Sequence, residues 1–397
     1  MPHILLKKHK LIDYYDNQDS VKTKIDFIAK SSRDTKIGLS CENKEFLFST
    51  VDRDGNDLIK LDNATRVTPV SFMQNALNDY AKIVNSEVLF SNTTSIYNKM
   101  EVEELYLKNI DYFAKDFKTN KEIWVEIGFG SGKHLLHQAK ENPDKILIGL
   151  EIHTPSIEQV LKQIKLENIT NVLTVNYDAR LFLEFLNSNS VGKIFVHFPV
   201  PWDKKPHRRV FSKEFIEESL RVLKIDGSLE LRTDSPNYYE YSKGLVESFK
   251  SYPSSIKKNQ DLAVVSKYEA RWKRQEKDIW DITISATENS LSKEIKGDFK
   301  FFDIDTSEED IKTIINKTQT LKKDFLVNFE DVYDIFTNNK KNGLLIKVTL
   351  GSFNRPVTKY IIIQNKKARY FQGEPIKTQT NILSHNYINN ILSDTKQ

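Results

Sequence analysis

The sequence has 397 residues, which predicts two or three domains. Lys and Arg number 59 against 55 Asp and Glu, and a net charge of +4 is too small to identify a nucleic-acid partner by itself. The single cysteine, Cys41, excludes a disulfide framework and a cysteine-based zinc site, and it fits a reducing compartment. The sequence shows no signal peptide and no apolar run long enough to span a bilayer, so we expect a cytoplasmic protein.

Short apolar runs and helical spacing describe the first part of the chain. Residues 46–48 and 58–61 predict strands, and the Asp-Gly turn within residues 53–57 predicts that they form a hairpin. Apolar residues at helical spacing predict helices over residues 71–84 and 101–117. No motif in this part indicates a chemistry.

The segment 124–132 reads WVEIGFGSG and organises the centre of the chain. Its apolar start predicts a buried parallel strand, its glycines predict a tight turn, and a helical pattern follows over residues 133–140. Strand, glycine turn and helix open a Rossmann-like nucleotide site, where the backbone passes close to the ligand. Glu126 disfavours a pyrophosphate and suits the ammonium and sulfonium of S-adenosylmethionine. The G-x-G-x-G spacing also differs from the dinucleotide fingerprint.

Apolar runs alternate with helical patterns after this segment, which predicts an α/β fold with a mostly parallel sheet. The predicted strands lie at residues 146–150, 172–175, 194–196 and 229–231, and helices fit at residues 155–167 and 213–223. Acidic residues end three of these strands, where ligands bind in such sheets. Glu151 is placed to hold the ribose hydroxyls of an adenosine, and Asp178 to accept from its amino group. Asp234 follows a later strand.

Two further segments combine basic and aromatic residues. Residues 198–209 read FPVPWDKKPHRR, in which prolines stiffen the chain around Trp202 and the following cations suit phosphates. Residues 266–275 read SKYEARWKRQ, whose cations, rings and carboxylate suit RNA. The alternative for the first segment is a solvated charged loop with a core tryptophan.

Together the motifs resemble the bacterial tRNA (guanine-N7)-methyltransferase family, over about residues 120–285. They occur in that family's order: EIGFGSG at 126–132, GLEI at 149–152, the Asp178 segment, FPVPW-x-K at 198–204, TD at 233–234 and SKYE at 266–269. The resemblance implies a Rossmann-like class I S-adenosylmethionine-dependent methyltransferase domain, with helices on both faces of the sheet. It also implies methylation of N7 of a guanine in the tRNA variable loop.

The resemblance assigns residues to the site. The cofactor-binding set is Glu126, Gly128, Gly130, Glu151 and Asp178, and the set that contacts tRNA or the guanine is Lys204, Asp234, Ser266 and Glu269. No metal is expected, because the histidines show no ligand spacing with acids or cysteines.

The sequence departs from the family's motifs at two positions. Ser266 replaces a threonine and keeps the hydroxyl, whereas Val200 replaces the aspartate regarded as the catalytic acid. Asp203, three residues away, is the first candidate to take over that role. Two alternatives stay open: methylation of another RNA or another base atom, and a protein that binds tRNA and cofactor without transferring the methyl group.

The chain therefore resembles a long form of the family. We expect an N-terminal extension over residues 1–95, β-rich and then helical, and a methyltransferase domain over residues 96–290. A C-terminal α+β extension is expected over residues 291–397, with a helix capped by Ser307 and a hairpin over residues 344–363.

Overall fold

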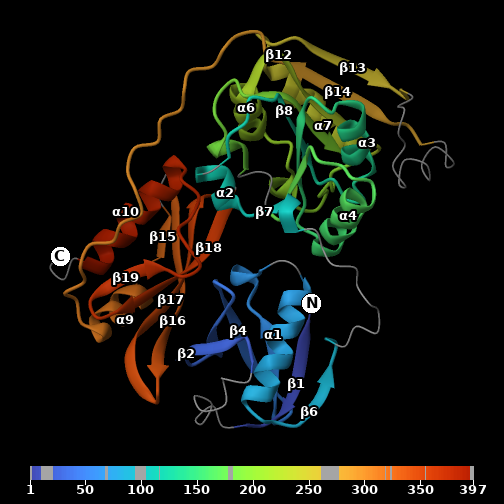
Figure 1. The fold of residues 1–397 in the computed structure, drawn as a ribbon. Helices are drawn as coiled ribbons and strands as arrows, with labels where there is room; N and C mark the ends of the chain where they lie inside the picture. Colours follow the sequence, from blue (N-terminus) through green and yellow to red (C-terminus); the bar gives the residue numbers. More distant parts are fainter. Residues whose placement is uncertain are drawn as a thin grey trace. The chain divides into compact units, whose positions relative to one another are not determined.

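The computed structural model of the chain divides into two compact units (Figure 1). Met100–Ile295 forms the central unit, and Met1–Lys99 joins Lys296–Gln397 in the terminal unit. The structure describes residues 2–9, 21–67, 70–93, 104–115, 117–177, 182–260, 277–317, 319–321, 324–353 and 355–393.

The central unit is built on an eight-stranded sheet in the order β13-β14-β12-β11-β8-β9-β10-β7. The strands β7 to β12 pair in parallel, whereas β14 is antiparallel to both of its neighbours. This order confirms the predicted α/β fold. The strands are β7 (Leu107–Lys108), β8 (Ile123–Ile127), β9 (Ile146–Leu150), β10 (Val172–Val175), β11 (Val191–His197), β12 (Leu223–Thr233), β13 (Ser254–Lys258) and β14 (Trp280–Ser285).

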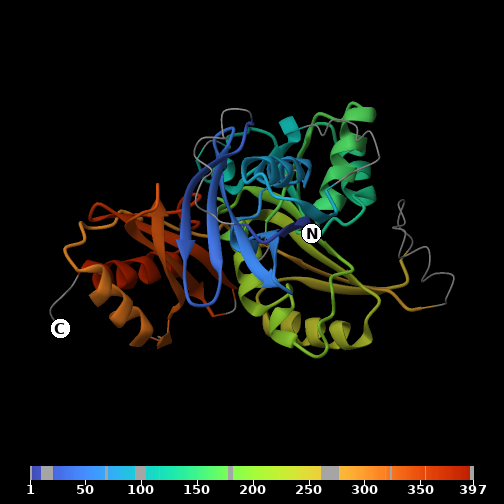
Figure 2. The same cartoon turned by 90° about the horizontal axis from the view of Figure 1, so that it is seen from below.

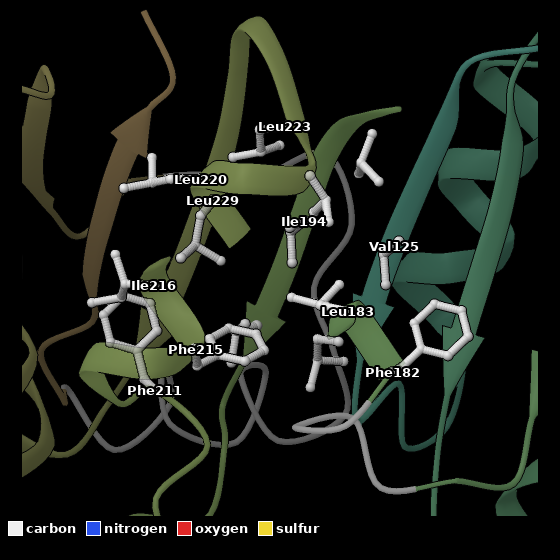
Figure 3. Packing of buried hydrophobic residues seen from close by; sticks show 14 of the residues in the cluster. Val125, Phe182, Leu183, Ile194, Phe211, Phe215, Ile216, Leu220, Leu223 and Leu229 are labelled. Atoms are coloured by element: carbon white, nitrogen blue, oxygen red, sulfur yellow. The ribbon is translucent and has the colours of Figure 1, made fainter. Parts of the chain in front are cut away.

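Helices cover both faces of this sheet (Figure 2). On one face, Trp124 and Phe195 pack against α3 and α4. On the other face, Val125 and Ile194 pack against α6 and α7, and Figure 3 shows phenylalanine and leucine side chains of this cluster. Because β8 is buried on both faces, its sequence is almost continuously apolar. The helices are α2 (Ile110–Lys115), α3 (Lys133–Glu141), α4 (Thr154–Leu166), α6 (Lys213–Val222) and α7 (Pro236–Ser248), with short 3-10 turns η3 (Glu104–Tyr106), η4 (Leu183–Phe185) and η5 (Pro206–Arg208).

The helix predicted over residues 101–117 is wrong for most of its described length. Glu104–Tyr106 forms a 3-10 turn, and Leu107–Lys108 pairs in parallel with residues 174–175 of β10. Only Ile110–Lys115 is α-helical. Pairing at the edge of the sheet therefore overrides the helical spacing of the apolar residues.

The terminal unit contains an eleven-stranded sheet, in which β15 pairs with β16 beside the main path β19-β18-β17-β16-β2-β3-β4-β5-β1-β6. Both predicted hairpins are present, as β4–β5 and β17–β18. The strands are β1 (His3–Lys7), β2 (Lys24–Lys30), β3 (Thr35–Cys41), β4 (Lys44–Arg53), β5 (Asn56–Leu61), β6 (Val88–Ser91), β15 (Gln319–Leu321), β16 (Leu326–Thr337), β17 (Lys340–Ser352), β18 (Arg355–Gln364) and β19 (Lys367–Tyr370). The helical elements are η2 (Asn63–Thr65), α1 (Val70–Ile83), α9 (Glu308–Lys317) and α10 (Gln379–Ser393).

The N-terminal and C-terminal segments meet in this sheet through antiparallel pairing of β2 with β16, where Ala29 lies opposite Ile335. A buried polar cluster adds to the junction. Lys36 Nζ lies 2.9 Å from a carboxylate oxygen of both Asp34 and Asp62, and the hydroxyl of Tyr360 donates to Asp62 over 2.9 Å. The two segments predicted as separate extensions thus share one sheet and one of its hydrophobic clusters.

Candidate active site

The site lies at the carboxyl end of β8, where the strand order reverses. In the sheet β8 separates β9 from β11, so the chain leaves β8 toward one side and later returns on the other. Ile127 of β8 lies opposite Leu150 of β9 and opposite Val196 of β11, so the three strands end at nearly the same level. A crevice at such a switch point is where open α/β sheets bind ligands.

Glu126 occupies the end of β8 and is 4% exposed. Its side chain lies on the face covered by α3, where His134 Nδ1 is 2.9 Å from its Oε2. Burying a carboxylate requires a polar partner, and this histidine supplies one. The contact orients Glu126 at the start of the glycine turn.

The turn after β8 depends on glycine because three of its residues have positive φ: Gly128 (68°), Gly130 (53°) and Gly132 (71°). A Cβ at Gly128 would meet no atom within 4 Å, which leaves the space beside this backbone open. A Cβ at Gly132 would instead overlap Val160 of α4. The first glycine thus permits close approach of a ligand, whereas the last permits close packing on α4.

Glu151 follows β9 and reaches across to this turn. Its Oε2 accepts the Gly130 N–H over 2.9 Å, and its Oε1 accepts the N–H groups of Ile152 and His153 over 2.8 and 2.9 Å. Each carboxylate oxygen has two acceptor positions, so Oε2 keeps capacity for a hydroxyl donor. The structure therefore places Glu126, Gly128, Gly130 and Glu151 at the neighbouring ends of β8 and β9.

Three predicted site residues lie outside the described residues: Asp178, Ser266 and Glu269.

Two histidines beside Glu126 were missed by the sequence analysis. His134 of α3 and His197 at the end of β11 have ring centroids 4.4 Å apart. Burial, with the charges of His134 and Arg232, holds the pKa of His197 well below its usual value. His197 is therefore neutral near pH 7 and does not repel a cationic ligand. The only sequence signal was the position of His197 at a strand end.

The loop after β11 has a strained backbone. Phe198 and Trp202 have φ of 50° and 47°, in a region that bulky residues rarely adopt. Val200 is 60% exposed and Trp202 is 37% exposed. Trp202 is therefore not buried in the core, as the alternative of a solvated charged loop with a core tryptophan required. The loop presents apolar surface where the family places an aspartate.

Arg209 holds this loop in place. It is 8% exposed, and its Nε donates to the Pro201 carbonyl over 2.8 Å. Its guanidinium lies 4.4 Å from the ring centroid of Tyr241 and 5.4 Å from that of Tyr238, both on α7. Its Nη2 is 3.4 Å from Asp203 Oδ1. Arg209 therefore fixes the loop, and with it Asp203, on the first turns of α7.

The remaining described site residues follow the same loop and β12. Lys204 is exposed on the loop. Asp234 lies between β12 and α7, and its carboxylate is 3.7 Å from Lys277 Nζ. Ser235 caps α7 by accepting the Tyr238 N–H, which places Asp234 one residue before the N-cap of the helix that Arg209 contacts.

Comparison with known proteins covers both units. A family model described as putative methyltransferase matches residues 120–282. A tRNA (guanine-N(7)-)-methyltransferase of Wolinella succinogenes is 39% identical over 364 residues, covering 90% of each chain. The chain belongs to this family. The enzymes of that name from Campylobacter jejuni subsp. jejuni (37% identity, 99% of this chain and 98% of theirs) and Helicobacter hepaticus (38%, 85% of each) also extend over the terminal unit.

Membership confirms the family and the methyltransferase class predicted from the sequence, and with the fold it supports S-adenosylmethionine as the methyl donor. Among the described residues, no three His, Cys, Asp or Glu side chains are arranged to hold a metal ion. In the same part of the chain, none of the helices has the length and apolar character needed to cross a bilayer.

Proposed function

We propose that this chain transfers the methyl group of S-adenosylmethionine to N7 of a guanine in the variable loop of tRNA, forming 7-methylguanosine. The observation that carries the proposal is the contact of Glu151 with the Gly130 N–H of the glycine turn that begins directly after Glu126 and Ile127, in a member of this family. When bound, the cofactor supplies a methyl group activated by its sulfonium. Because the proposed substrate is tRNA, we also propose a cytoplasmic location.

The described residues suit this cofactor. Glu126 would accept hydrogen bonds from its ammonium, and the neutral His197 adds no positive charge that would repel that group. Oε2 of Glu151 accepts from the ribose hydroxyls, and the open space at Gly128 admits the ligand beside the backbone. Asp178 is proposed to accept from the adenine amino group.

Guanine N7 carries a free lone pair and loses no proton when it is methylated, so the reaction needs no general base. The protein has to align N7 with the methyl group, exclude water and stabilise the positive charge that develops on the base. Asp203 and Asp234 can accept from the N–H groups of guanine, and we propose that they hold it. Lys204, Ser266 and Glu269 complete the contacts to tRNA.

Asp203 is the carboxylate that we propose in place of the family's aspartate, because Val200 has no polar atom to offer. Its contact with Arg209 supports this role, since the guanidinium keeps the carboxylate oriented on the loop. The role is positioning and electrostatic, not proton transfer.

The test is transfer of labelled methyl from S-adenosylmethionine to unmodified tRNA by the purified chain, with the modified nucleoside identified by mass. We expect 7-methylguanosine. If tRNA binds but no methyl moves, the chain is a binding protein and Val200→Asp should restore transfer. If another nucleoside is methylated, the proposed base is wrong. Asp203→Asn should lower the single-turnover rate, and an unchanged rate and tRNA affinity would remove Asp203 from the site.

A further inference from the structure

An apolar row crosses the face of the terminal sheet opposite α1. In the strand register, Val51 of β4 lies opposite Leu58 of β5, Leu58 opposite Leu5 of β1, and Leu5 opposite Phe90 of β6. Val51 is 37% exposed and Phe90 is 51% exposed, while the two leucines are half-buried.

The row lies outside the core of the unit. The alternate residues of the same strands, such as Ile4, Phe48 and Ile59, point the other way and pack against α1. The solvent face of an antiparallel sheet is normally polar, so four apolar side chains in line across four strands indicate a contact surface.

Cations flank the row on both sides. Lys60 and His3 lie opposite each other in the neighbouring row on one side, and Arg53 and Lys7 belong to the row on the other side. Lys60, Arg53 and Lys7 are exposed, and no carboxylate occupies a strand position in either flanking row. Glu87 lies 3.5 Å from Lys7 in an exposed ion pair. Such a pair contributes little free energy, so a phosphate can replace Glu87 as the partner of Lys7 at little cost.

An aromatic pair ends the row. The ring of Phe90 stacks on His3 with centroids 5.5 Å apart and an angle of 29° between the ring planes. Rings on an open sheet face, with cations beside them, are the arrangement by which proteins stack unpaired bases and hold the adjoining phosphates.

The distribution of charge favours RNA over a protein partner. The terminal unit contains 30 Lys and Arg against 25 Asp and Glu, whereas the central unit contains 29 against 30. The net positive charge of the chain, which attracts a polyanionic substrate, therefore lies in the terminal unit.

We propose that the face formed by Val51, Leu58, Leu5 and Phe90, with Lys60, Arg53 and Lys7 beside it, is a second tRNA-binding surface. An unpaired base stacks on Phe90, and the cations contact the phosphates on either side. The proposal rests on tRNA being the substrate, and it assigns the terminal unit to substrate affinity.

The experiment compares matched variants of the full chain. Phe90→Ala is paired with Phe302→Ala, which removes a phenylalanine that is 61% exposed elsewhere in the same unit. Lys60→Glu is paired with Lys340→Glu, since Lys340 is also exposed and lies at the start of β17. The readouts are the dissociation constant for unmodified tRNA at several salt concentrations, the affinity for S-adenosylmethionine, and KM and kcat for tRNA.

We expect Phe90→Ala to weaken tRNA binding about tenfold, within the range for loss of one stacked base. Lys60→Glu should lower the slope of log affinity against log salt by about one or more. In both variants KM should rise, while cofactor affinity and kcat at saturating tRNA stay unchanged. The two control variants should bind tRNA as the unsubstituted chain does.

Wild-type tRNA affinity in both Phe90→Ala and Lys60→Glu would overturn the proposal. So would a change of oligomeric state in Phe90→Ala at unchanged tRNA affinity, since it would show that the face binds protein. Failure of the unsubstituted chain to methylate tRNA concerns the proposed function instead, because the binding measurement does not depend on turnover.

Discussion

Arg209→Lys should impair methylation of tRNA while leaving cofactor binding intact. The substitution keeps the positive charge but removes the planar group that donates to Pro201 and lies on Tyr241. A hydrogen bond from a charged donor contributes about 1.5–3 kcal/mol. Packing of a guanidinium on a ring contributes about 0.5–2 kcal/mol. The half-exposed pair with Asp203 adds less than about 1 kcal/mol.

Lysine can recover part of these interactions, so we expect a net loss of about 2 kcal/mol in the free energy that holds the loop. If the loop must be in this conformation to present guanine, kcat/KM for tRNA should fall about 30-fold. The affinity for S-adenosylmethionine should change less than twofold, because Glu126 and Glu151 keep their contacts.

The assay is steady-state methyl transfer to unmodified tRNA, with cofactor binding measured by calorimetry. Arg208→Lys is the matched control: Arg208 is exposed and lies 5.2 Å from the ring centroid of Trp202, and a lysine there still offers a cation to a phosphate. Its kcat/KM should fall by less than about threefold. If Arg209→Lys keeps the kcat/KM of the unsubstituted chain, the loop does not need this arginine and the reasoning fails.

Three further outcomes follow from the central unit. Glu126→Gln should weaken S-adenosylmethionine binding at least about tenfold, because a neutral amide attracts the ammonium less; calorimetry showing equal affinity would exclude that contact. Gly132→Ala should lower stability by about 1–3 kcal/mol in chemical unfolding, since its methyl group overlaps Val160 at a positive φ, and an unchanged midpoint would contradict the packing. Because the pKa of His197 is depressed when folded, the unfolded chain binds the extra proton below about pH 6.5, and stability falls as the pH drops through that value. His197→Asn should therefore show a shallower loss of melting temperature between pH 7 and 5, and parallel curves for the two proteins would refute the assignment.

The sequence was most informative where chemistry and local structure coincide. A glycine cluster indicates a turn without reference to any other segment, and an acid after an apolar run indicates the end of a strand. Glu126 and Glu151 could therefore be assigned to neighbouring strand ends. The role of Arg209 could not be predicted from the sequence, which indicates only that the loop is basic. The role depends on the tyrosines of α7 that lie beside the loop in the folded chain. His134 and His197 are eight and seventy-one residues from Glu126, and nothing in their spacing indicates that they meet there.

The pairing of β2 with β16 was equally hidden. About 300 residues separate Ala29 from Ile335, and hydrophobic patterns report only which strands have a buried face, not which distant strand each will join. The short strand β7 was mistaken for helix because two paired residues are too few to show an alternating pattern.

The central unit is inserted between the two segments that form the terminal unit, and this has a consequence during synthesis. As the chain leaves the ribosome, β2 emerges early, but its partner β16 appears only after the whole methyltransferase unit has been made. The methyltransferase unit can fold first, and until β16 is made the backbone N–H and C=O groups on one edge of β2 have no partner strand. Premature termination before Tyr360 would therefore leave Lys36, Asp34 and Asp62 without the Tyr360 side of their cluster, so completion of the polar junction between the first and last segments depends on the end of the chain.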